Sequence, residues 1–148
     1  MIPLTVRHAE MRAHAGEVSL PGGAVDDTDA DPETAALREA WEEIGLDPKL
    51  VRIIGVLDDV WIPVSNFELR PFVGTVASRP TLTPHDTEVS AIVELPVAAL
   101  FDEAVIATAE FSARGFTVHA GAYRYGGVQI WGATALTLGM LAHVLERA

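Results

Sequence analysis

The segment at residues 32–45 limits the fold more than any other part of the sequence, because it predicts an amphipathic helix with one acidic face. Pro32 suits the first position of a helix, and Asp31 before it can cap the N-terminal N–H groups. Apolar residues recur at spacings of three and four, which places them on the face expected to pack on the core. These residues are Leu37, Ala40, Trp41 and Ile44. Gly45 then ends the helix, because glycine readily takes the left-handed conformation of a C-terminal cap.

Three glutamates, Glu39, Glu42 and Glu43, crowd the opposite face of this helix within an arc of roughly 100°. Like charges three and four residues apart destabilise a helix, and the helix dipole also disfavours anions in its C-terminal half. A solvated face is the ordinary explanation for glutamates on a helix. Here the turn formed by Gly22 and Gly23 lies just upstream, where a ligand can approach the backbone closely. Because hard divalent cations prefer clustered carboxylate oxygens, we predict that Mg²⁺ or Mn²⁺ bridges these glutamates to substrate phosphates.

The charge balance of the chain narrows the range of partners. Ten basic residues stand against 21 acidic ones, for a formal charge of -11, which repels nucleic acid and anionic membranes. The chain has no cysteine, which excludes disulfides, thiolate metal sites and a cysteine nucleophile. No segment of the sequence resembles a signal peptide or a membrane span. We therefore expect a cytoplasmic protein with a small-molecule ligand, folded as a single domain over residues 1–148.

Outside the acidic helix, the hydrophobic pattern predicts short strands and one further helix. Strands are expected at residues 2–7, 18–20, 51–62, 67–77, 88–95, 107–113, 116–120 and 123–132. A second amphipathic helix runs from Ala133 to the C-terminus. Strands in pairs around two helices favour an α/β or α+β domain, with a mixed β-sheet sandwiched between α-helices.

The run from Gly23 to Leu46 resembles the Nudix box. That motif is Gly, five residues, Glu, seven residues, Arg-Glu, an apolar residue, any residue, Glu-Glu, any residue, Gly and an apolar residue. The second half matches at Arg38, Glu39, Ala40, Glu42, Glu43, Gly45 and Leu46. In the first half, Asp29 stands where the motif has Glu, and one extra residue separates it from Arg38. This departure weakens the assignment of Asp29 as the partner of Arg38.

The resemblance implies a Nudix fold and a metal-dependent diphosphatase. Glu39, Glu42 and Glu43 would ligate the metals with the backbone carbonyl of Gly22, and Arg38 would orient the carboxylates. The metals would neutralise the pyrophosphate and activate water for in-line attack, and a carboxylate would accept the proton. Outside the box, Glu88 resembles a glutamate that precedes a late strand in relatives. Its alternatives are general base, additional metal ligand or an ordinary charge on an edge strand.

The segment from Leu4 to Gly23 resembles the extended motif of the coenzyme A pyrophosphatases within this superfamily. Matches fall at Leu4, Thr5, Arg7, Arg12, His14, Gly16, Glu17, Val18, Ser19, Pro21, Gly22 and Gly23. Asp26 and Asp29 fit the subfamily's Gly-Gly-x-x-Asp-x-x-Asp pattern, and "IWGATA" fits its ending.

The subfamily resemblance implies cleavage of coenzyme A to 3′,5′-ADP and 4′-phosphopantetheine, with Arg7, Arg12 and His14 binding the substrate. Alternatives are ADP-ribose, a dinucleotide or a nucleoside triphosphate as substrate, or a nucleotide-binding domain without turnover. A mobile polar loop is the plain alternative for the three basic residues.

The sequence also gives expectations for residues outside these motifs. Trp41 and Trp131 are predicted to pack in the core, and no pattern distinguishes His8, His85, His119 or His143 from surface residues. Relatives carry an apolar strand before the Leu4 segment, where this chain has only "MIP". We expect either a shortened start or a sheet edge that a second protomer covers, forming a homodimer.

Overall fold

A computed structural model describes residues 1–8, 17–63, 65–85, 87–113 and 116–148 of the chain. Arg12 and His14 lie outside these ranges. In chain order the elements are β1 (Ile2–Arg7), β2 (Val18–Ser19), α1 (Pro32–Ile44), η1 (Pro48–Leu50), β3 (Val51–Val56), β4 (Val60–Ile62), β5 (Phe67–Leu69), β6 (Phe72–Val76), β7 (Val89–Leu95), η2 (Val97–Phe101), β8 (Ile106–Ala113), β9 (Phe116–Tyr125), β10 (Val128–Ile130) and α2 (Gly132–Glu146).

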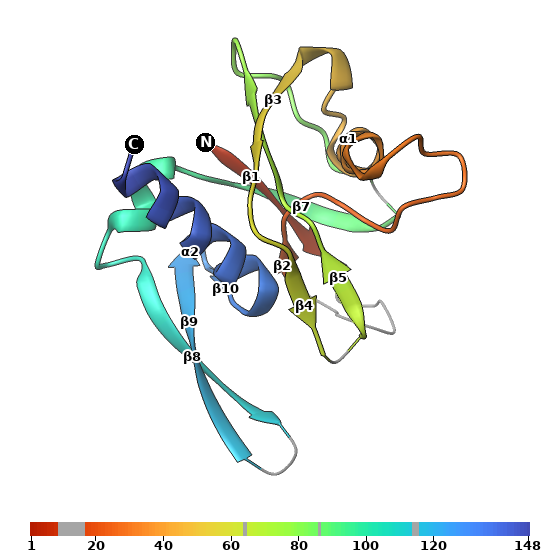
Figure 1. Cartoon of the computed structure of the whole chain (residues 1–148). Helices are drawn as coiled ribbons and strands as arrows, with labels where there is room; N and C mark the ends of the chain where they lie inside the picture. The colour runs from red at the N-terminus through yellow and green to blue at the C-terminus, as the bar shows by residue number, and fades with distance from the viewer. Residues whose placement is uncertain (9–16, 64, 86, 114–115) are drawn as a thin grey trace.

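The described strands form small antiparallel sheets, in the orders β2-β1-β7, β10-β9-β8, β3-β6 and β4-β5. In Figure 1, α1 lies on one side of β1 and α2 on the other. Strands combined with two helices confirm the predicted α+β fold. Neither helix of the described residues is long and apolar enough to cross a bilayer.

Strand β1 holds the N-terminal segment in the middle of its sheet. It pairs with β7 from Ile2 to Arg7, but with β2 only at Thr5 and Val6. Residues 2–4 therefore have no strand neighbour on the β2 side within the described part of the chain. The expectation that a second protomer covers an open edge stays a prediction for this short stretch.

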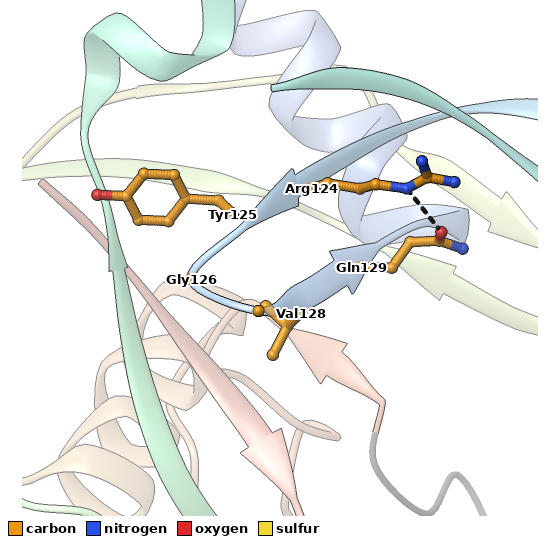
Figure 2. A pocket seen from close by; sticks show the side chains of 6 residues that line it. Arg124, Tyr125, Gly126, Val128 and Gln129 are labelled. Carbon is orange, nitrogen blue, oxygen red and sulfur yellow. Dashed lines mark hydrogen bonds between the residues drawn. The ribbon is translucent and has the colours of Figure 1, made fainter. Parts of the chain in front are cut away.

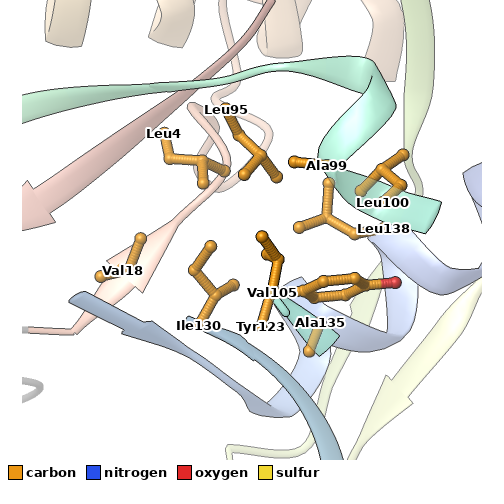
Figure 3. Packing of buried hydrophobic residues seen from close by; sticks show 10 residues of the cluster. All are labelled: Leu4, Val18, Leu95, Ala99, Leu100, Val105, Tyr123, Ile130, Ala135 and Leu138. Carbon is orange, nitrogen blue, oxygen red and sulfur yellow. The ribbon is translucent and has the colours of Figure 1, made fainter. Parts of the chain in front are cut away.

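The core fixes β1 and β7 against the C-terminal half of the chain. Its buried members are Leu4, Val18, Leu95, Ala99, Leu100, Val105, Tyr123, Ile130, Ala135 and Leu138 (Figure 3). They come from β1, β2, β7, β9, β10, η2, α2 and the turn before β8, so one cluster joins both ends of the sequence. Burial of this apolar surface holds in place the strands from which the site loops emerge.

Helix α1 has both predicted caps, and Ala40 and Ile44 on its predicted core face are buried, but Trp41 is not. The Asp31 side chain accepts a hydrogen bond of 2.7 Å from the Thr34 N–H, and Gly45 caps the C-terminus at φ 69°. However, Trp41 is 54% exposed, so its predicted core packing is wrong. The helix is rotated so that Glu43, only 8% exposed, is buried beside Ala40 and Ile44 while Trp41 lies at the rim.

The two long strands predicted at residues 51–62 and 67–77 are each interrupted, giving β3 with β4 and β5 with β6. At the interruption, Arg70 donates to both carboxylate oxygens of Asp59, at 2.9 and 2.7 Å. Pro71 has no N–H to donate to a ladder, although its carbonyl accepts from Leu57 at 2.9 Å. The proline and the ion pair together explain why neither strand is continuous.

Candidate functional site

Five side chains line a cavity of about 240 Å³ between α1 and the loop that precedes β7. Glu39, Glu42 and Glu43 come from the helix, and His85 and Glu88 come from the loop. The structure thus places Glu88 beside the box glutamates, as expected for a base or an additional ligand. It also brings in His85, which the sequence did not distinguish from a surface residue.

Backbone hydrogen bonds attach this loop to the end of α1. The last carbonyls of a helix have no partner within the helix, and here two of them accept from loop N–H groups. Thr83 donates to the Ile44 carbonyl and His85 to the Glu43 carbonyl, each at 2.9 Å. Glu88 then donates its N–H to the His85 carbonyl at 3.2 Å. The helix end therefore determines where the loop residues stand relative to the glutamates.

The glycine turn after β2 contacts the same helix. The Gly22 N–H donates to Oε2 of Glu43 at 3.1 Å. A Cβ atom added to Gly23 would overlap the carboxyl group of Glu39, so any larger residue there would displace this carboxyl group. The contact recorded for Gly22 is through its N–H group, and the ligand role of its carbonyl stays a prediction.

Arg38 links three carboxylates at the edge of the site. It donates from Nε and Nη2 to the two oxygens of Asp29, at 3.0 and 2.9 Å, and from Nη1 to Glu39 and Glu42, at 2.9 and 3.1 Å. Asp29 is thus the partner of Arg38 despite the extra residue between them. The hydrogen bond to Arg38 is the main reason that the pKa of Asp29 is lowered.

A tight turn accommodates the extra residue. Within this turn, the Asp29 N–H donates to the Asp26 carbonyl at 3.0 Å, and the Asp26 N–H donates to Oδ2 of Asp29 at 2.7 Å. The Asp26 side chain also accepts from the Thr28 N–H at 2.9 Å. These bonds fold the additional residue into the loop and leave the Asp29 carboxylate within reach of the guanidinium.

Burial disfavours the ionised form of the Glu43 carboxyl group. It raises the pKa of Glu43 to about 7, with smaller contributions in the same direction from the charges of Glu39 and Glu88. The Gly22 N–H and the positive charge of Arg7 act in the opposite direction. Arg7, on β1, therefore lies close enough for its charge to influence Glu43, and its role in binding the substrate stays a prediction. A cation in the cavity would relieve the cost of ionising Glu43.

The donor set suits a hard divalent cation. Four carboxylates converge on one cavity, and oxygen donors are those that Mg²⁺ and Mn²⁺ prefer. Glu39 and Glu42 each form an ion pair with Arg38 through one carboxylate oxygen. The second carboxylate oxygen of each takes no part in these ion pairs. Among the described residues, no three acidic or histidine side chains already stand at metal-ligand spacing. Side-chain movements would be needed to close a coordination shell.

A family model for the NUDIX domain matches residues 4–116, which include the turn, the helix and the loop of this site. This chain belongs to the Nudix family. Nudix proteins typically use divalent metal ions and nucleotide-like substrates, in line with the class of cofactor expected from the sequence. The resemblance noted for the box at residues 23–46 is therefore confirmed at the level of the family.

Relatives of this Nudix chain include proteins named uncharacterized Nudix hydrolase NudL. The protein of Salmonella paratyphi B is 39% identical over 139 residues, covering 94% of this chain and 72% of the relative. Those of Cronobacter sakazakii and Escherichia coli are 47% and 46% identical over 95 residues, each covering 64% of this chain and 49% of the relative. The chain thus spans between about half and about three quarters of the length of these relatives.

Another hollow, of about 400 Å³, lies over the turn between β9 and β10 (Figure 2). It is lined by Arg124, Tyr125, Gly126, Gly127, Val128 and Gln129. Arg124 donates from Nε to Gln129 at 3.3 Å across the hairpin. None of the described residues that line this hollow is acidic or belongs to the Nudix box, so it is separate from the carboxylate site.

Proposed function

We propose that this chain is a divalent-metal-dependent diphosphatase that cleaves the pyrophosphate bond of coenzyme A or its acyl derivatives. The observation that carries the proposal is the contact between the glycine turn and the helix, where Gly22 bonds Glu43 and Gly23 adjoins Glu39. The turn ends the segment that resembles the coenzyme A pyrophosphatase motif, and the helix carries the box carboxylates. The part of the sequence that suggests the substrate thus adjoins the part that suggests the chemistry.

Within this proposal, Glu39, Glu42 and Glu43 hold the metal, and the Gly22 carbonyl is a further ligand. Bound divalent ions would supply neutralisation of the diphosphate and activation of a water molecule. Arg38 keeps the Glu39 and Glu42 carboxylates oriented through its Nη1 bonds and is itself fixed by Asp29.

Glu88 enters the cavity from the loop rather than from the helix, which suits a general base separate from the metal ligands. Water attacks phosphorus, the bond from phosphorus to the bridging oxygen breaks, and Glu88 accepts the proton from the water. The products are 3′,5′-ADP and 4′-phosphopantetheine. Arg7 on β1, together with Arg12 and His14, would bind the phosphates of the substrate.

The test is hydrolysis of coenzyme A, ADP-ribose and a nucleoside triphosphate in parallel, with Mg²⁺ or Mn²⁺ and with products identified by mass. Release of 3′,5′-ADP from coenzyme A, faster than cleavage of the other compounds, is the expected result. Faster cleavage of another compound would assign a different diphosphate substrate. No cleavage of any of them would favour a nucleotide-binding domain without turnover.

A further inference from the structure

Among the described residues that line the cavity, His85 is the one that is not a glutamate. Ionised Glu39, Glu42, Glu43 and Glu88 can only accept hydrogen bonds. The diphosphate of a substrate also brings only acceptor oxygens, so carboxylates alone cannot orient it. Of the side chains known to line the cavity, His85 is the one that can donate to a phosphate oxygen.

The backbone of His85 is held on both sides. Its N–H donates to the Glu43 carbonyl at 2.9 Å, and its own carbonyl accepts from Glu88 and Val89, at 3.2 and 3.0 Å. These bonds tie the residue to the end of α1 and to the start of β7. The imidazole therefore emerges from a fixed point beside the box glutamates.

One nitrogen of the His85 ring is already engaged. Nδ1 lies 3.1 Å from the hydroxyl oxygen of Thr87. When this hydroxyl donates to Nδ1, the ring proton resides on Nε2. Surrounding carboxylates favour the arrangement in which a donor, and not another acceptor, faces them. Thr87 thus acts as a positioning residue for the ring.

We propose that His85 donates a hydrogen bond from Nε2 to a phosphate oxygen of the bound diphosphate, with the ring tautomer set by Thr87. His85 is then a substrate-binding residue in the loop before β7, outside the Nudix box. This inference rests on the proposed function, because it requires a diphosphate in the carboxylate cavity.

The experiment uses methylenediphosphonate, a diphosphate analogue that cannot be hydrolysed at its bridge, and measures its Kd by calorimetry in excess Mg²⁺. His85→Ala should weaken binding about tenfold, as expected for one lost hydrogen bond to a charged acceptor. His85→Gln, which retains an N–H donor, should recover part of the affinity. Thr87→Val should have an intermediate effect. His119→Ala is the matched control, because His119 is exposed and pairs with Glu110 in the β8–β9 hairpin.

A titration with Mn²⁺ alone, followed by electron paramagnetic resonance, separates substrate binding from metal binding. The Mn²⁺ affinity should be equal in the wild type and His85→Ala. A loss of Mn²⁺ affinity would overturn the inference by making His85 a metal ligand, and an unchanged Kd for the analogue would also overturn it. Binding that depends on His85 without cleavage of coenzyme A would support the inference while refuting the proposed function. A wild type that does not bind the analogue would overturn the inference, while the proposed function would still be decided by the hydrolysis of coenzyme A.

Discussion

The backbone N–H of Gly22 donates to Oε2 of Glu43 at 3.1 Å, across 21 positions of sequence. This bond joins the turn after β2 to the last turn of α1 and gives a buried carboxylate one stabilising partner. One hydrogen bond does not offset the burial, which raises the pKa of Glu43 to about 7. In the metal-free protein, ionisation of Glu43 is therefore unfavourable, and a bound cation would offset this cost.

The first prediction concerns the pH dependence of stability without metal. Glu43 has a folded pKa of about 7 against a reference value of 4.5. Its contribution to stability is fully present below about pH 4.5 and is lost as the pH rises through 7. The difference corresponds to about 3 kcal/mol in the free energy of unfolding. Glu43→Gln should remove this contribution to the pH dependence and make the chain more stable than the wild type at pH 8.

Urea unfolding in the presence of a chelator at pH 5 and pH 8 measures this effect. The comparison is between the pH slopes of the two proteins, since other groups contribute equally to both. Identical slopes in the wild type and Glu43→Gln would show that Glu43 is not held as a destabilised anion.

The second prediction concerns the metal site. Glu42→Gln should abolish turnover while changing the metal-free stability by less than about 0.5 kcal/mol, because the side chain is 55% exposed and its pair with Arg38 is partly solvated. Millimolar Mg²⁺ or Mn²⁺ should raise the Tm of the wild type much more than that of the variant. Differential scanning fluorimetry with and without metal measures the shift in Tm for each protein.

A matched control for the metal prediction is Glu94→Gln. Glu94 also pairs with an arginine, Arg79, but does not line the carboxylate cavity. The metal-induced shift in Tm should be unchanged in this control. Equal shifts in the wild type and Glu42→Gln would place the metal elsewhere.

The third prediction tests the glycine turn. Gly23→Ala should reduce both turnover and the metal-induced shift in Tm, because the added methyl group would overlap the Glu39 carboxyl group and displace it. Gly121→Ala on β9 is the control, since an added Cβ there meets no atom within 4 Å. Steady-state kinetics and melting curves on both variants make the comparison. Full metal response in Gly23→Ala would mean that the position of Glu39 is not important for metal binding.

The fourth prediction compares two bidentate ion pairs. Asp29, whose side chain is 2% exposed, pairs with Arg38, and Asp59, whose side chain is 31% exposed, pairs with Arg70. Asp29→Asn should lower kcat, because Arg38 then loses the partner that holds it against Glu39 and Glu42. It should also lower the free energy of unfolding, and by more than Asp59→Asn does, because the Asp29 side chain is the less exposed of the two.

Asp59→Asn should have little effect on the free energy of unfolding, since surface ion pairs contribute little, and should leave kcat unchanged. Kinetics and chemical unfolding of the two variants give both quantities. If the two substitutions had the same effect on kcat, the pair of Asp29 with Arg38 would have no special role in orienting the site.

Local sequence patterns succeeded where local interactions decide the structure. The caps of α1 at Asp31 and Gly45 follow from the residue types at its ends, and β1 and β7 follow from short apolar runs. The long strand predicted at residues 51–62 was wrong, because its interruption depends on Arg70 and Pro71 of the neighbouring strand. The hydrophobic pattern of one segment carries no information about the residues of a neighbouring strand that interrupt it.

The sequence by itself determined the Nudix family and the acidic face of α1, since both are encoded within one continuous run of residues. Only the tertiary structure decided how this helix is rotated, with Glu43 buried and Trp41 exposed. It also decided that His85 reaches the carboxylates. These features arise from packing and hydrogen bonds between segments that are far apart in the chain. Such interactions depend on the folded arrangement and not on the spacing of residues along one helix.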